Sequence, residues 1–167
     1  MGLVPYNLSP IQQGIQFGHA VVEFALRYGQ RPDYNEWANN HKTFIILNGG
    51  TTNNHPSTPG TMQTALAELE SRGIRRETFH EPDLNDALTA IVFLVDDRVY
   101  DPSVVGEFPW KADAEGMPFS VVDLLDPTWR IDNFTPHMQQ KYDEWQNNMG
   151  GSRNVFLRYF LKQFRLA

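Results

Sequence analysis

A polar stripe runs along one face of residues 9–28. At about 100° per residue, Gln12, Gln16 and His19 fall on this stripe. The imidazole of His19 can take a proton from water and pass it to a leaving group, which is general acid–base chemistry. The two amides can hydrogen-bond carbonyl or hydroxyl groups of a substrate. The alternative is a histidine that is simply satisfied within a polar face.

An acidic turn follows a predicted strand at residues 74–79. Its carboxylates belong to Glu81, Asp83 and Asp86, and they can orient His19 or hold a water molecule. We assign that role to Glu81, because Asp86 directly precedes an apolar strand and is a residue type that stabilises turns. The alternative is that all three carboxylates serve the turn alone.

Other kinds of chemistry have little support. Residues 80–83 lack the spacing of a helix-borne metal motif, and residues 48–50 lack the spacing of a phosphate-binding loop. The chain has no cysteine, so it can form neither a thiolate nucleophile nor a disulfide. We therefore predict that the protein uses no metal and no cofactor.

Alternating predicted elements must position these side chains. Ser9 and Pro10 are suited to the start of a helix, and apolar residues recur at helical spacing from Met62 to Leu69. Strands are predicted at residues 2–6, 43–47, 74–79 and 89–95. The order strand–helix–strand–helix–strand–strand predicts an α/β fold with mainly parallel pairing and one late antiparallel strand.

Apolar residues flank the polar stripe of the first helix on both sides, so we expect most of that helix to be buried. Gly14 and Gly18 lie between the two flanks, and each costs roughly 1 kcal/mol of helix propensity relative to Ala. We expect another backbone to approach closely there. The flanks are Ile11, Ile15, Val22 and Leu26 on one side and Phe17, Val21, Phe24 and Tyr28 on the other.

The composition changes after residue 96. Residues 97–133 are rich in Pro, Asp and aromatics, and two helical patterns follow. We predict one α/β domain at residues 1–96 and a C-terminal helical extension at 97–167 packed on it. Residues 150–167 are basic and residues 101–149 are acidic, and we expect these two segments to pair rather than to meet phosphate.

The formal net charge of −6 argues against a general nucleic-acid-binding surface. No apolar run approaches the roughly 18–20 residues that cross a bilayer, and the N-terminal sequence lacks the pattern of a signal peptide. Together with the lack of cysteine, these features predict a cytoplasmic protein without a membrane segment.

The sequence Gln16-Phe-Gly-His-Ala20, in a helix after a short strand, resembles the Gln-x-x-His-Ala signature of type II peptidyl-tRNA hydrolases. The order of the following features is similar too. A Trp precedes the second strand, Lys42 leads into it, and the next helix ends near Gly-Ile. The acidic turn at residues 79–87 stands where that family has its Asp-Ala-Gly-Arg-Thr turn. The resemblance covers about residues 1–96.

The resemblance implies a three-layer sandwich around a four-stranded mixed sheet. It also implies hydrolysis, by water alone, of the ester that joins a peptide to the terminal ribose of tRNA. On this hypothesis His19 is the base or proton shuttle and Glu81, with Asp83 nearby, orients it. The residues that position the substrate are Gln12, Gln16, Lys42 and Asp86.

The chain departs from the family at several positions. The family's Lys-Gly-Lys pattern before the glutamine is replaced by residues 10–12, and Leu84 and Asn85 stand for the arginine and threonine of the turn. A second hypothesis is therefore a non-catalytic module that keeps the fold and binds a protein partner through its acidic loops and C-terminal helices. Such folds are commonly homodimers, but the sequence selects no surface for a second copy.

Overall fold

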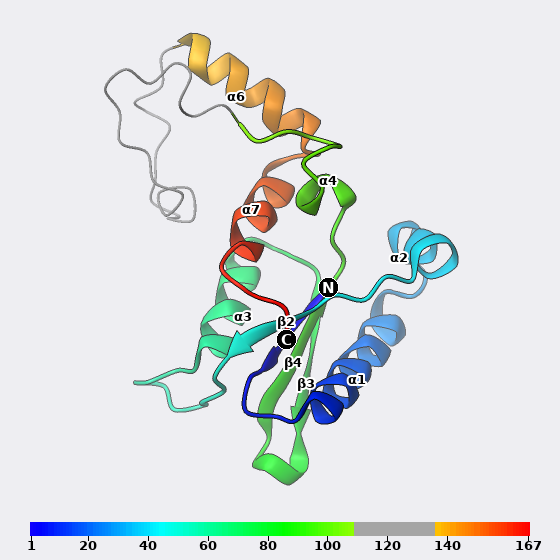
Figure 1. Cartoon of the computed structure of the whole chain (residues 1–167), viewed down its shortest axis with the longest axis vertical. Helices are drawn as coiled ribbons and strands as arrows, with labels where there is room; N and C mark the ends of the chain where they lie inside the picture. The colour runs from blue at the N-terminus through cyan, green and yellow to red at the C-terminus, as the bar shows by residue number, and fades with distance from the viewer. Residues whose placement is uncertain (109–135) are drawn as a thin grey trace. The chain divides into compact units, whose positions relative to one another are not determined.

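The computed structural model describes residues 1–108 and 136–167 (Figure 1). The chain divides into two compact units. The first comprises Met1–Leu94 together with Phe164–Ala167, and the second comprises Val95–Gln163. Each unit has its own cluster of buried apolar side chains.

The first unit is built on a four-stranded mixed sheet in the order β2-β1-β4-β3. β1 (Gly2–Pro5) pairs in parallel with β2 (Ile46–Gly50), whereas β4 (Ala87–Phe93) runs antiparallel to β1 and to β3 (Arg76–Glu81). The predicted α/β fold with a mixed sheet is confirmed. Among the described strands, β4 is the one antiparallel strand, and it comes late in the chain as predicted. The expectation of mainly parallel pairing is wrong, because β4 lies between β1 and β3, so that only β1 and β2 of this sheet pair in parallel.

β2 lies three residues further along the chain than predicted. Phe44 stands outside the sheet with 54% of its surface exposed, and the strand continues through Gly49 and Gly50. Glycine at 49 leaves room for the buried Met62, whose sulfur would have to shift because an added Cβ would lie 2.2 Å from it. The Asn-Gly-Gly sequence that predicts a loop is therefore the end of a strand beside α3.

Helices cover both faces of this sheet and make three layers (Figure 1). α1 (Pro10–Tyr28) packs on β4, β3 and β1, while α3 (Thr61–Ser71) packs on β2, β1 and β4. The apolar core under α1 consists of Val4, Phe17, Ala20, Phe24, Ala90 and Val92.

α1 begins where the sequence predicts. The Ser9 hydroxyl accepts a hydrogen bond from the Gln12 N–H, and Oε1 of the Gln12 side chain accepts one from the Ser9 N–H at 3.1 Å. This reciprocal capping box, with Pro10 as the first helical residue, satisfies two otherwise unpaired N–H groups. Gln12 thus has a structural role at the helix start.

One flank of α1 is not buried, contrary to the prediction. Ile11, Ile15, Val22 and Leu26 are each more than half exposed. A Cβ added at Gly14 or Gly18 would meet no atom within 4 Å among the described residues, so the expected close approach of another backbone is absent there. Helical periodicity identifies an apolar face, but it does not say whether the rest of the chain covers it.

Short helical segments connect the main elements. α2 (Pro32–Glu36) and the π-helical turn η1 (Trp37–His41) lie between α1 and β2. The 3₁₀ turn η2 (Pro82–Leu84) follows β3. Asn85 and Asp86 then adopt positive φ angles of 55° and 57°, a conformation that these two residue types tolerate well.

The second unit contains α4 (Asp97–Tyr100), α6 (Pro136–Asn148) and α7 (Ser152–Leu161). The two long helices match the predicted C-terminal helices. The segment 97–133, whose composition is typical of a loop, begins with the short helix α4, and its residues 109–133 lie outside the described residues. Lys162 donates to Glu107 at 2.9 Å, which confirms pairing between the basic tail and the acidic segment.

A buried arginine organises this second unit. Arg158 has 2% of its side chain exposed, and its guanidinium donates to the carbonyl oxygens of Arg98, Val99 and Gly106. Trp145 donates to the Gly106 oxygen as well, at 2.8 Å. Because one guanidinium group donates to three carbonyl oxygens, the Arg158 side chain ties α7 to the segment that begins at α4.

None of the helices within the described parts of the chain is long and apolar enough to cross a membrane.

Candidate functional site

The polar stripe of α1 lies over the edge strand β3. Side chains along a strand alternate between its two faces, so Glu77, Phe79 and Glu81 share the face that meets α1. Arg27 donates to Glu77 at 2.7 Å near one end of this contact. At the other end Gln16 meets Glu81, and the ring of His19 lies on Phe79 between them.

The side-chain amide of Gln16 is the buried centre of the site. It is 7% exposed, and its Nε2 donates to Oε2 of Glu81 at 2.5 Å. Its Oε1 accepts from the hydroxyl of Thr89 at 2.8 Å. An ionised carboxylate can only accept hydrogen bonds, so Glu81 and Thr89 together fix which way the amide points.

Thr89 reaches this site because of a β-bulge in β4. Phe79 pairs with Ala90, but the next residue, His80, pairs with Leu88, so Thr89 is the extra residue. A bulge re-aims a side chain that regular alternation would send to the other face. Strand periodicity alone gives no signal for such an insertion, and sequence analysis therefore missed Thr89.

His19 lies one turn along α1 from Gln16 and is exposed. Its ring stacks on that of Phe79, with 4.5 Å between centroids and 19° between planes. Among the described residues neither ring nitrogen of His19 has a hydrogen-bond partner. The predicted contact from Glu81 to His19 is thus absent, because Gln16 takes the carboxylate, and both imidazole nitrogens remain accessible to water or to a substrate.

The remaining predicted site residues lie outside this cluster. Gln12 belongs to the helix cap, and Asp83 is exposed within η2. The backbone oxygen of Asp86 accepts from Asn54 at 3.3 Å and lies 3.0 Å from Nδ1 of His80. Through these contacts Asp86 stabilises the turn, which is the alternative role considered for the three acidic residues.

Lys42 is also away from the cluster. It is exposed at the end of η1 with a φ of 54°, and its backbone N–H donates to Trp37. Within the described residues its ammonium group has no partner. The structure thus brings together Gln16, Glu81 and the neighbouring His19 but does not bring Lys42 to them.

No metal centre is apparent in the part of the chain that the structure describes. Within residues 1–108 and 136–167, no three or more His, Cys, Asp or Glu side chains are grouped so that they could hold an ion. His80, which the sequence places beside Glu81, faces the Asp86 carbonyl instead.

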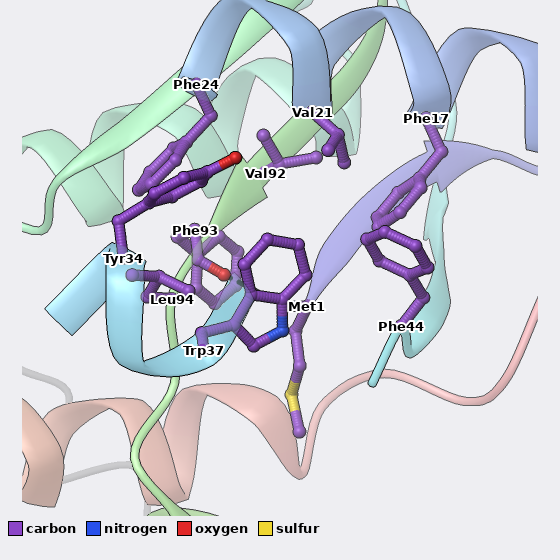
Figure 2. A pocket seen from close by; sticks show the side chains of 10 residues that line it. All are labelled: Met1, Phe17, Val21, Phe24, Tyr34, Trp37, Phe44, Val92, Phe93 and Leu94. Carbon is purple, nitrogen blue, oxygen red and sulfur yellow. Dashed lines mark hydrogen bonds between the residues drawn. The ribbon is translucent and has the colours of Figure 1, made fainter. Parts of the chain in front are cut away.

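A separate apolar pocket lies on the other flank of α1. Figure 2 shows side chains from α1 and from the α1–β2 connection turned toward one another. The rings of Phe17 and Phe44 meet edge to face at 5.5 Å, and Trp37 lies 5.4 Å from Phe44. His19 does not line this pocket, so the polar cluster and the apolar pocket are different features of the first unit.

Comparison with known proteins gave no match: no family model, no curated protein sequence and no solved structure is similar to this chain. The chemistry of the polar cluster, which consists of Gln16, Glu81, Thr89 and the neighbouring His19, is therefore the guide to function. An exposed imidazole beside a fixed carboxylate–amide pair can move a proton at a bound ester and can hydrogen-bond its oxygen atoms.

Proposed function

We propose that the protein is an esterase of the peptidyl-tRNA hydrolase type that acts in the cytoplasm. The observation that carries the proposal is the hydrogen bond between Gln16 and Glu81. These residues are 65 positions apart. In the resemblance, Gln16 matches the glutamine that precedes the family histidine, and Glu81 matches the acidic residue of the turn. A chance match of Gln-x-x-His-Ala would give no reason for this contact.

The proposed reaction uses one water molecule. His19 takes a proton from the water as it attacks the ester carbonyl, and the tetrahedral intermediate then expels the ribose oxygen, which receives that proton from His19. The products are the free peptide acid and deacylated tRNA. Glu81, held by Gln16, accepts a hydrogen bond from the substrate or the water, and Thr89 holds the amide of Gln16.

A second function, a non-catalytic protein-binding module, is favoured by the charges of the first unit. A tRNA-binding surface gains affinity from Lys and Arg on phosphates. Here Arg27 is paired with Glu77, Arg75 with Asp33, and Arg76 with Glu70. Under this hypothesis the protein retains the fold but lacks the cations that would hold the nucleic acid.

A cleavage assay separates the two functions. The full chain is incubated with an N-acetylated aminoacyl-tRNA, and release of deacylated tRNA is followed for wild type and His19→Ala. We expect release by wild type and a rate about 10²–10⁴-fold lower for the variant. Equal rates for both proteins, or no release by either, would remove the catalytic proposal and favour the binding module.

The salt dependence of tRNA binding gives a second readout. Because most arginines of the first unit are paired, we expect only a few phosphate contacts and hence a shallow fall of affinity with salt. A steep slope would mean that a basic surface outside the described contacts holds the tRNA.

A further inference from the structure

The outer face of α1 carries an uninterrupted aliphatic stripe. Ile11, Ile15, Val22 and Leu26 are 77%, 51%, 58% and 78% exposed. Gly18 lies at the middle of the stripe, where an added Cβ would meet no atom within 4 Å among the described residues. Single exposed apolar residues are common, but a row of four along one helix is typical of a contact surface.

The spacing of the stripe is symmetric. Counted from either end, its four large residues are separated by four, seven and four positions. Two copies related by a twofold axis must present the same surface to each other, so that residue i meets j and j meets i. Antiparallel pairing of two α1 helices meets this condition, since Ile11 then faces Leu26 of the second copy and Ile15 faces Val22.

We propose that the protein self-associates through antiparallel packing of α1 against α1 of a second copy. Gly18 lies at the crossing point, where the missing side chain lets the two backbones approach. Gly18, which lowers the helix propensity and would have no neighbour at its Cβ position among the described residues, acquires a function in this arrangement. The proposal rests on exposure and spacing and not on the proposed esterase activity. In this register Gly18 of one copy faces His19 of the other, so ester cleavage would require the monomer.

The area and charge of the surface favour a second copy over other partners. The four side chains make a patch of roughly 400–500 Å² on each copy, so two copies bury just under the ~1,000 Å² expected of a biological interface. A weak dimer follows. The stripe contains no charged residue, and the neighbouring Arg27 is held by Glu77, so an anionic membrane or a nucleic acid has no cation to bind there.

The first test is sedimentation equilibrium of the full chain from about 10 to 500 µM, a range that covers weak association. We expect the apparent mass to rise toward that of a dimer. Ile15→Glu and Val22→Lys each place a charge against an aliphatic side chain of the second copy and should remain monomeric. The double variant places the introduced carboxylate of one copy against the introduced ammonium group of the other, and it should dimerise again at low salt.

Ile15→Lys/Val22→Lys is the matched control, since like charges then meet and the protein should stay monomeric. Circular dichroism checks that each variant is folded. A wild type that remains monomeric over the whole concentration range would overturn the proposal. So would an Ile15→Glu/Val22→Lys variant that stays as monomeric as Ile15→Lys/Val22→Lys.

Cross-linking tests the crossing point, because the chain has no native cysteine. Gly18→Cys should form a disulfide-linked dimer under mild oxidation, whereas Ser71→Cys, at the end of α3, should not. Equal cross-linking of the two variants would contradict the proposed geometry.

Discussion

At the scale of single residues, the site depends on a chain of three polar side chains. Thr89 donates to Gln16, and Gln16 donates to Glu81. Since the Thr89 side chain is fully buried, no water can replace its hydroxyl without rearrangement. The orientation of the Glu81 carboxylate beside His19 thus depends on a residue that would touch no substrate.

Thr89→Val tests this dependence. Valine keeps the shape but leaves Oε1 of Gln16 without a donor, which we expect to cost about 1–2 kcal/mol of stability. We also expect a lower rate of ester cleavage with little change in KM, because the carboxylate loses its fixed position. Thr89→Ser restores the hydroxyl and should recover most of the rate, which a purely steric role of Thr89 would not explain.

Sequence analysis could find part of this site. Gln16 and His19 follow from helical spacing, and Glu81 from its place in an acidic turn. Thr89 could not be found, because a bulge is a one-residue insertion whose position depends on pairing between strands. The capping role of Gln12 could not be distinguished either, since the same amide that can bind a substrate can close a helix cap.

At the scale of elements, α1 shows what periodicity leaves open. Its start, its polar stripe and its buried Phe17 and Phe24 were predictable, because they follow from capping chemistry and from 3.6-residue spacing. The exposure of Ile15 and Val22 was not, because covering a face depends on what the tertiary fold places beside it. The position of β4 between β1 and β3 likewise depends on tertiary packing and not on the strands' own composition.

α7 depends on one buried cation. Arg158→Met keeps much of the apolar volume but leaves the carbonyls of Arg98, Val99 and Gly106 without this donor, and we expect a loss of about 3 kcal/mol or more. Urea unfolding of the full chain measures it. Lys162→Met is the control, since its exposed pair with Glu107 should contribute at most about 1 kcal/mol; equal effects of the two changes would contradict the role of Arg158.

α4 carries a pH-dependent contact. Hydrogen bonds from the Arg98 side chain, opposed by partial burial and aided by the Arg98 N–H, lower the pKa of Asp96 from 3.8 to about 2. Because the folded pKa lies below the unfolded one, the carboxylate stabilises the fold fully above about pH 4, and this contribution is lost as the pH falls toward 2.

Asp96→Asn isolates this contribution from the other carboxylates. The variant should be less stable than wild type in thermal unfolding at pH 5, and the difference should shrink steadily toward pH 2. A difference that stays constant from pH 5 to pH 2 would show that the ionised carboxylate contributes nothing.

At the scale of the whole molecule, the end of the described chain belongs to the first unit. The Asn48 N–H donates to Arg165 at 2.8 Å, and the Ala167 N–H donates to Ile46 at 3.0 Å, so residues 164–167 lie as a short antiparallel segment against β2. The predicted extension at residues 97–167 differs from this, because its last four residues belong to the first unit. Helical patterns in the sequence do not indicate that the chain comes back to β2.

Removal of residues 164–167 tests this contact. The first unit should remain folded, but the amide of Asn48 loses its acceptor and should exchange with solvent much faster than in the full chain. Amides in the middle of β4 serve as the internal reference. Unchanged protection at Asn48 would show that the contact is not formed in solution.

The esterase proposal depends most directly on the imidazole over Phe79. Single-turnover cleavage of an N-acetylated aminoacyl-tRNA, with enzyme in excess, compares His19→Ala with His80→Ala, a matched histidine change on the same unit whose ring faces the Asp86 carbonyl. We predict a rate about 10²–10⁴-fold below wild type for His19→Ala and a nearly unchanged rate for His80→Ala. Equal rates for the two variants would contradict the account.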